Sequence, residues 1–191
     1  MANAGSQPLN GRVASVMSGE KGSMIRLFSL PDLESLLEIE NQSFPKSPYD
    51  WTTFLSLHAR YPETFLVYLS PSTLQHEASG LAPAPDAGES RDPAAGHRSR
   101  REKISAYIIF SRDGHILSIA VHPHYRRRGV ATELLRRAME TSWPRKVWAE
   151  VRRSNQGARA FYDTIGFQWR RTVRNYYGNE DALIVEWTPP G

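Results

Sequence analysis

Hydrophobic and polar residues follow two different periods along this chain, and the changes between them mark the expected helices and strands. Short apolar runs predict strands over residues 24–28, 65–69, 104–111, 115–121, 146–151, 169–173 and 182–187. Apolar residues at helical spacing predict helices over residues 29–42, 50–60, 129–142 and 155–165. The order β-α-α-β-β-β-α-β-α-β-β predicts an α/β protein with a mixed sheet that carries helices on both faces.

Turn and capping residues support these boundaries. Asp50 is suited to cap the second helix, and Pro45 and Pro48 end the helix before it. Asp113-Gly114 is a typical hairpin turn between two of the expected strands.

The composition changes character in two segments. Residues 1–23 are rich in Gly, Ser, Ala and Asn, and we expect a disordered tail there. Residues 70–101 have almost no large apolar side chains, so burial cannot offset the entropy of ordering them, and we expect a flexible insertion. The rest predicts one domain over residues 24–190, in a chain whose 191 residues are 40% hydrophobic.

Composition also limits the chemistry. The chain has no cysteine, which excludes disulfides, cysteine-ligated zinc and a cysteine nucleophile. The net charge is +4, with arginines concentrated in the second half, and such a surface suits an anionic ligand. No apolar run approaches the roughly 20 residues that span a bilayer, and residues 1–23 lack the pattern of a secretory signal. We therefore expect a cytoplasmic protein.

Residues 116–131 predict an anion-binding loop. An apolar run ends at Val121, a turn with three consecutive arginines follows, and a helical pattern begins directly after Gly129. Free N–H groups at a helix N-terminus favour negative charge, and a glycine lets a phosphate approach the backbone without meeting a Cβ. The alternative is a strand–helix junction with an exposed basic face, because short glycine motifs often occur without a phosphate.

Three polar residues further along are candidates for chemistry. Glu150 lies in an apolar strand, where it either faces water or acts as a base near the strand's C-terminal end. Asn155 is suited to cap the helix that follows. Tyr162 on that helix either packs or donates a proton.

The histidines give no support for a metal site. His122 and His124 form a His-x-His pair and His115 is near in sequence, but no acidic or cysteine side chain completes a ligand set.

Together these motifs resemble the GNAT acetyltransferase superfamily and, within it, the RimI-type N-terminal acetyltransferases. Arg126-x-x-Gly129-x-Ala131 is similar to the superfamily's loop signature, with Ala131 where glycine is more frequent. The segments that resemble the RimI-type pattern are Glu150-Val151-Arg152, Ser154-Asn155, Ala158, Tyr162, Gly166-Phe167, Arg174-Asn175-Tyr176-Tyr177 and Glu180-Asp181-Ala182. The resemblance covers residues 24–187 apart from the insertion, and it implies the GNAT acyl-CoA N-acyltransferase fold.

The resemblance also implies a reaction with acetyl-CoA as donor and without a metal. Glu150 matches the general base, and Tyr162 matches the general acid that protonates the departing thiolate. The residues implied in donor binding are Ile119, Ala120, Val121, Arg126, Arg127, Arg128, Gly129, Val130, Ala131, Asn155 and Tyr162. Those implied in acceptor binding are Phe44, Pro45, Tyr49, Tyr176 and Tyr177. The loop from Phe44 to Tyr49 differs from the usual bacterial RimI form, which puts strict alanine specificity in doubt; packing between two helices is the alternative role for Phe44.

The expected acceptor is the N-terminal α-amine of a protein, with a ribosomal protein as one candidate. An α-amine has a pKa of about 8, against about 10.4 for lysine, so a modest carboxylate base suffices. The alternatives are a lysine or small-amine acetyltransferase, a CoA-binding module without turnover, and an RNA-binding protein, although interleaved aromatic motifs for single-stranded RNA are missing. We expect a monomer or weak dimer that binds neither membrane nor nucleic acid.

Overall fold

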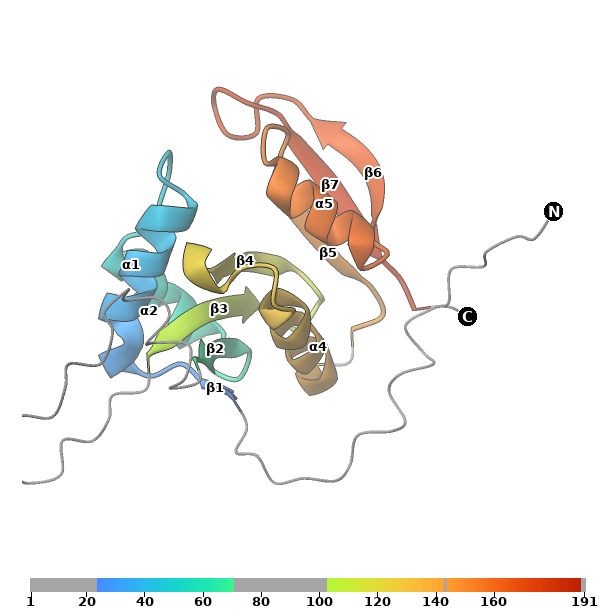
Figure 1. The fold of residues 1–191 in the computed structure, drawn as a ribbon. Coiled ribbons are helices and arrows are strands. Elements are labelled where there is room, and N and C mark those ends of the chain that lie inside the picture. Colours follow the sequence, from blue (N-terminus) through green and yellow to red (C-terminus); the bar gives the residue numbers. More distant parts are fainter. Residues whose placement is uncertain (1–23, 71–102, 143, 190–191) are drawn as a thin grey trace, which may run out of the picture.

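The computed structural model describes residues 24–70, 103–142 and 144–189, which form two antiparallel sheets with helices packed against them (Figure 1). The first sheet has the order β1-β2-β3-β4, with strands at Ile25–Leu27, Phe65–Leu69, Ile104–Phe110 and Ile116–Val121. The second sheet has the order β5-β7-β6, with β5 at Val147–Arg152, β6 at Gln168–Val173 and β7 at Ala182–Trp187. Every strand predicted from the sequence is present, with ends that differ by one or two residues at most.

The four predicted helices are also present, as α1 (Leu33–Ser43), α2 (Trp51–Arg60), α4 (Val130–Ser142) and α5 (Gln156–Thr164). The Asp50 carboxylate caps α2 as expected, because it accepts the Thr53 N–H at 2.8 Å. The first predicted helix is divided, since its N-terminal residues form a separate 3-10 turn, η2 (Leu30–Asp32). A second 3-10 turn, η3 (Pro123–Tyr125), was not predicted and leads from β4 towards α4.

One parallel contact joins the two sheets. His115 and Trp148 form an isolated parallel bridge, and the Trp148 N–H donates to the carbonyl of Gly114 at 2.9 Å. The mixed sheet predicted from the sequence therefore consists of two antiparallel sheets that meet at this bridge. In the part of the chain that the structure describes, β4 and β5 have no further ladder between them, so most of the β4 edge is not paired with a strand.

The hydrophobic core lies on both faces of β3. Ala106, Ile108 and Phe110 face one side, where they join the cluster beneath α4 and α5. Tyr107 and Ile109 face the other side, beneath α1 and α2. Figure 1 shows α1 and α2 on one side of this sheet and α4 on the other. Burial on both faces explains why the sequence of β3 is a continuous apolar run rather than an alternating one.

Side chains along β5 alternate between the buried core and the opposite face of the strand. Val147, Ala149 and Val151 are buried in the core cluster beneath α4 and α5. Because successive side chains point to opposite faces of a strand, Trp148, Glu150 and Arg152 share the other face. These three polar or aromatic side chains therefore follow one another along the face of β5 that is turned away from this core cluster.

The Asp113-Gly114 turn is present, and its glycine has a structural reason. Gly114 has φ +95°, and a Cβ on this residue would lie 1.9 Å from the carbonyl oxygen of Lys146. Only glycine lets the turn approach the start of β5 this closely.

Some predictions fall on residues that the structure does not describe. The proposed tail at 1–23 and nearly all of the proposed insertion at 70–101 lie outside the described residues. Among the described helices, none is long and apolar enough to cross a membrane.

Candidate active site

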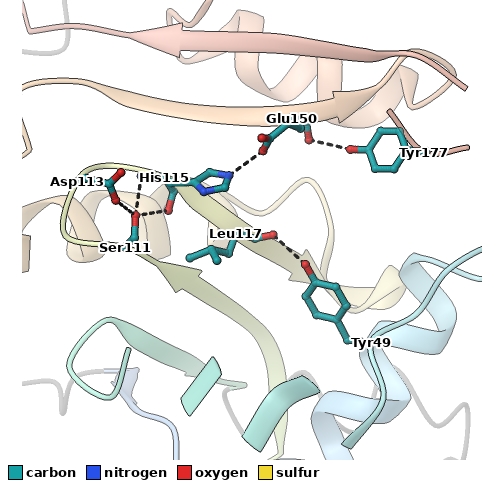
Figure 2. A network of polar contacts seen from close by, with 7 residues as sticks. All are labelled: Tyr49, Ser111, Asp113, His115, Leu117, Glu150 and Tyr177. Carbon is teal, nitrogen blue, oxygen red and sulfur yellow. Dashed lines mark hydrogen bonds and ion pairs between the residues drawn. The ribbon is translucent and has the colours of Figure 1, made fainter. Parts of the chain in front are cut away.

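The centre of the site is a contact between Glu150 on β5 and His115 at the start of β4. The Glu150 carboxylate lies 2.7 Å from His115 Nε2, and its side chain is only 15% exposed (Figure 2). The His115 ring stacks on Trp148 with the centroids 3.7 Å apart and the planes 3° from parallel. The parallel bridge between the sheets thus brings the two side chains together, and the stack fixes the ring against Glu150.

Opposing effects act on the charge of Glu150. Burial is the largest single effect and raises the pKa of this carboxyl, but the hydrogen bond and charge interaction with His115, together with further hydrogen bonds that include one from Tyr176, lower the net pKa below its ordinary value of 4.5. An ionised carboxylate can only accept hydrogen bonds, so the His115 Nε2–H donates. The result is a half-buried carboxylate that is ionised at neutral pH and is ready to accept a proton.

Tyrosines from two loops surround this carboxylate. Tyr177, in the loop between β6 and β7, donates its hydroxyl to the backbone carbonyl of Glu150 at 3.2 Å (Figure 2). Its neighbour Tyr176 is half-exposed and packs edge-on against the Tyr177 ring. Burial and the charge of Glu150 raise the pKa of Tyr176. Two of the five residues implied in acceptor binding, Tyr176 and Tyr177, therefore lie beside Glu150.

A third tyrosine comes from the loop between α1 and α2. The Tyr49 hydroxyl donates to the Leu117 carbonyl at 3.4 Å, so the loop touches the β4 edge (Figure 2). The Tyr49 N–H donates at 2.9 Å to Glu40, whose side chain is buried in α1 and also accepts a hydrogen bond from the Tyr107 hydroxyl. Burial raises the pKa of Glu40. The buried contact between Glu40 and Tyr107 fixes the end of the loop, and no local pattern in the sequence predicted it.

Tyr162 lies on the other side of the second sheet from Glu150. It is 4% exposed on α5, with its ring against Phe161 and Phe167. Burial raises the pKa of Tyr162 above its ordinary value of 10, and the neighbouring Tyr177 and Glu150 add to the effect. Its hydroxyl therefore stays protonated throughout the physiological range.

The free edge of β4 presents backbone polar groups next to the site. The carbonyls of Leu117 and Val121 point away from β3, and Arg126 Nε donates to Val121 at 2.9 Å. By the alternation of the strand, the N–H and C=O of Ile119 lie on the same edge, whereas Ala120 turns its own towards β3. An extended ligand could pair with this edge as an added strand does.

The loop before α4 has the backbone of an anion site. Arg127 has φ +63° and Gly129 has φ +81°, and a Cβ on Gly129 would meet nothing within 4 Å. The first helical N–H groups, those of Val130 and Ala131, have no acceptor within the helix. The space next to the Gly129 Cα is thus open, and free helical N–H groups follow directly after it in the chain.

The arginines of this loop differ in their contacts. Arg126 reaches back to Ser43 Oγ at 3.1 Å as well as to Val121, so its side chain joins the loop to the end of α1. Arg128 lies over the Tyr125 ring at 5.8 Å, and it is exposed, as is Arg127. Of the predicted donor-binding arginines, Arg126 is therefore held by the protein while the other two face solvent.

The remaining predicted residues have clear local roles. Asn155 caps α5, because its side-chain oxygen accepts the Ala158 N–H at 3.0 Å. Phe44 packs partly against the core beneath α1 and α2, which agrees with a role between two helices, and Pro45 is exposed. Among the described residues, no three His, Cys, Asp or Glu side chains are grouped as a metal site would require.

The residue that sequence reasoning missed is His115. It was weighed only as a metal ligand, yet its Nε2 contacts a carboxylate 35 residues away. The local signal is weak, since a histidine after a hairpin turn is usually a surface residue. Only the bridge to Trp148 places it.

Comparison with known proteins identifies the family. The model of the acetyltransferase (GNAT) family matches residues 33–167, and the chain belongs to this family. It is therefore an N-acetyltransferase of the GNAT fold, as the resemblance implied.

Several N-acetyltransferases are similar to this chain. An uncharacterized N-acetyltransferase of Methanocaldococcus jannaschii is 30% identical over 171 residues, which cover 85% of this chain and 89% of that protein. The ribosomal protein bS18 alanine N-acetyltransferase of Salmonella typhimurium is 40% identical over 77 residues, but these span only 37% of this chain and 52% of the relative. The crystal structure of Ard1 from Thermoplasma volcanium is 27% identical, with a TM-score of 0.62 over 87% of this chain and 97% of that one.

Proposed function

We propose that this enzyme transfers the acetyl group of acetyl-CoA to the N-terminal α-amine of a protein. The observation that carries the proposal is the Glu150–His115 pair, which holds an ionised carboxylate where β4 and β5 stop pairing. The relative from Salmonella supports an α-amine acceptor, because an alanine residue has no other amine to acetylate.

The chain offers groups for each part of the donor. The open space above Gly129 and the free N–H groups of Val130 and Ala131 suit the pyrophosphate. The β4 edge at Ile119 and Val121 suits the pantetheine arm, which carries amide groups that can pair with a strand. A donor bound in this way would have its thioester near the point where the two sheets diverge, beside Glu150.

The proposed reaction is a direct attack of the amine on the thioester. Glu150 accepts, directly or through a water, the proton that the amine loses, and His115 holds the carboxylate in position. A backbone N–H of the β4 edge can stabilise the charge that develops on the carbonyl oxygen. The C–N bond forms and the C–S bond breaks, and Tyr162 donates its proton to the departing thiolate.

The acceptor entrance is formed by aromatic side chains from two loops. Tyr176 and Tyr177 from the β6–β7 loop lie beside Glu150, and Tyr49 from the α1–α2 loop contacts the β4 edge at Leu117. This lining suits a peptide N-terminus better than a small amine, because it offers a surface beyond the reacting nitrogen. A ribosomal protein with an N-terminal alanine is one candidate acceptor.

The experiment that tests the proposal uses short peptides in matched pairs. Each pair has the same sequence with an internal lysine, once with a free and once with a blocked N-terminus, and the first two residues vary across the set. We expect mass spectrometry to find acetylation of free N-termini alone. Equal acetylation of blocked peptides would show that lysine is the acceptor, and CoA binding without any transfer would show a binding module.

A further inference from the structure

Arg152 connects the two loops that surround the acceptor entrance. Its Nη2 donates to Ser47 Oγ at 2.8 Å, in the α1–α2 loop and 105 residues away in the sequence. Its Nη1 lies 3.6 Å from the Glu180 carboxylate, in the β6–β7 loop. Both loops lie at the same end of the molecule, at the top of Figure 1. One side chain from the end of β5 thus spans the space between them.

The surroundings of Arg152 fix the guanidinium firmly. The side chain is only 17% exposed, and its Cζ lies 3.9 Å from the centroid of the Tyr177 ring. This close stack favours the cation through the electrons of the ring. Tyr177 in turn donates its hydroxyl to the backbone carbonyl of Glu150, so the ring beneath the guanidinium is itself held against β5.

The partner on the far loop is also held in place. Glu180 accepts the Ser154 N–H, and its backbone carbonyl accepts the Tyr177 N–H at 3.0 Å. The charge of Arg152 is therefore opposed by a carboxylate that cannot move away without breaking these contacts. Arg152 Nη1 itself is fully buried and makes no hydrogen bond within the described residues.

We propose that Arg152 is a positioning residue that sets the width of the acceptor entrance by holding the α1–α2 and β6–β7 loops together. The proposal rests on the function proposed above, since the entrance matters only if a peptide enters there. The guanidinium is suited to this role because its planar fork can bond to Ser47, face Glu180 and stack on Tyr177 at the same time. A lysine has no planar fork, so its single ammonium cannot reproduce the three contacts in this geometry.

The test compares Arg152→Lys with Arg153→Lys. Arg153 is the next residue, and it pairs with Asp181 at 3.7 Å, but its side chain is 69% exposed. Among the described residues, no hydrogen bond or ion pair joins it to the α1–α2 loop. We expect Arg152→Lys to raise the peptide KM roughly tenfold, the loss expected for a charge-assisted hydrogen bond. The kcat at saturating peptide and the Kd for CoA should stay within about twofold, because neither depends on the width of the entrance. Arg153→Lys should leave all three values nearly unchanged.

A second variant separates positioning from stability. Ser47→Ala removes one contact of Arg152 on the exposed loop, and we expect it to raise the peptide KM roughly threefold without lowering Tm. Combined with Arg152→Lys, it should add little, because both changes break the same contact.

Hydrogen exchange tests the connection without any acceptor. In the free enzyme, Arg152→Lys should speed amide exchange in both loops, residues 44–49 and 175–181, whereas Arg153→Lys should not affect residues 44–49. An unchanged peptide KM together with unchanged exchange in Arg152→Lys would overturn the proposal, as would an equal effect of Arg153→Lys. If the wild type acetylates no peptide but exchange changes as expected, then the proposed function fails and the contact between the loops stands.

Discussion

Replacement of Glu150 by Gln removes the proposed base with little change in shape. The amide oxygen of Gln can still accept the His115 Nε2–H, so the ring and its stack on Trp148 should stay in place. A positioned general base contributes about 10²–10⁴-fold to the rate, which corresponds to about 2.7–5.5 kcal/mol of transition-state stabilisation. Because the Glu150 side chain is only 15% exposed, bulk water can hardly replace it. We therefore expect kcat/KM to fall by roughly 10³-fold or more.

The assay is favourable for this chain because it contains no cysteine. A thiol reagent then reports only the CoA that is released, with no signal from the enzyme. Glu186→Gln is the matched control, since this carboxylate lies on the adjacent strand β7 and pairs with Lys146 and Arg170 instead of the site. Its kcat/KM should stay within about twofold.

The reasoning would be refuted by an active Glu150→Gln enzyme. A variant that keeps more than a third of the wild-type kcat/KM, with unchanged CoA affinity, would show that another group takes the proton. Tyr162→Phe tests the acid in the same assay, and we expect kcat to fall roughly 10²-fold. Since burial raises the pKa of Tyr162, its loss of a proton should not limit the wild-type rate below pH 10.

The other predictions concern the neighbour of the base, the anion loop and the buried acid. His115→Phe keeps an aromatic ring but removes the hydrogen bond to Glu150, so kcat/KM should fall roughly tenfold. The pKa of Glu150 should rise, and the acid limb of the pH–rate profile should therefore move to higher pH. An acid limb that does not move would contradict the pairing of His115 with Glu150. Gly129→Ala should weaken CoA binding in calorimetry, while Gly178→Ala, which has a similar φ of +77° and equally open surroundings, should not. Burial raises the pKa of Glu40 in the folded state, so the free energy of unfolding of the wild type should fall relative to that of Glu40→Gln as the pH rises from 4.5 through that pKa. Urea unfolding measures both free energies, and a difference between them that does not depend on pH would exclude this prediction.

Much of the fold could be predicted because its strands have distinct local patterns. The run at 104–111 predicted a strand without showing which face was buried, and the structure buries β3 on both faces between two helical layers. The turn at Asp113-Gly114 was also predicted, whereas the reason for its glycine was not, because Lys146 approaches from another part of the chain. Local sequence patterns thus predict the helices and strands, whereas contacts between distant parts of the chain explain why some positions require a particular residue.

The site shows the same division. Glu150 and Tyr162 could be proposed from motifs, and the structure places them near each other but on opposite sides of the second sheet. The contacts of Arg126 with Ser43 and of Arg152 with Ser47 could not be predicted, because each joins residues more than 80 positions apart and no sequence periodicity extends that far.

By itself, the sequence determined the order of the helices and strands and the glycine that precedes the helix α4. These depend on neighbours within a few positions along the backbone, which steric and periodic rules govern. Only the tertiary structure decided that His115 meets Glu150 and that Arg152 meets two loops. Those contacts depend on how two sheets join at a single bridge, and the packing of the whole core fixes that geometry.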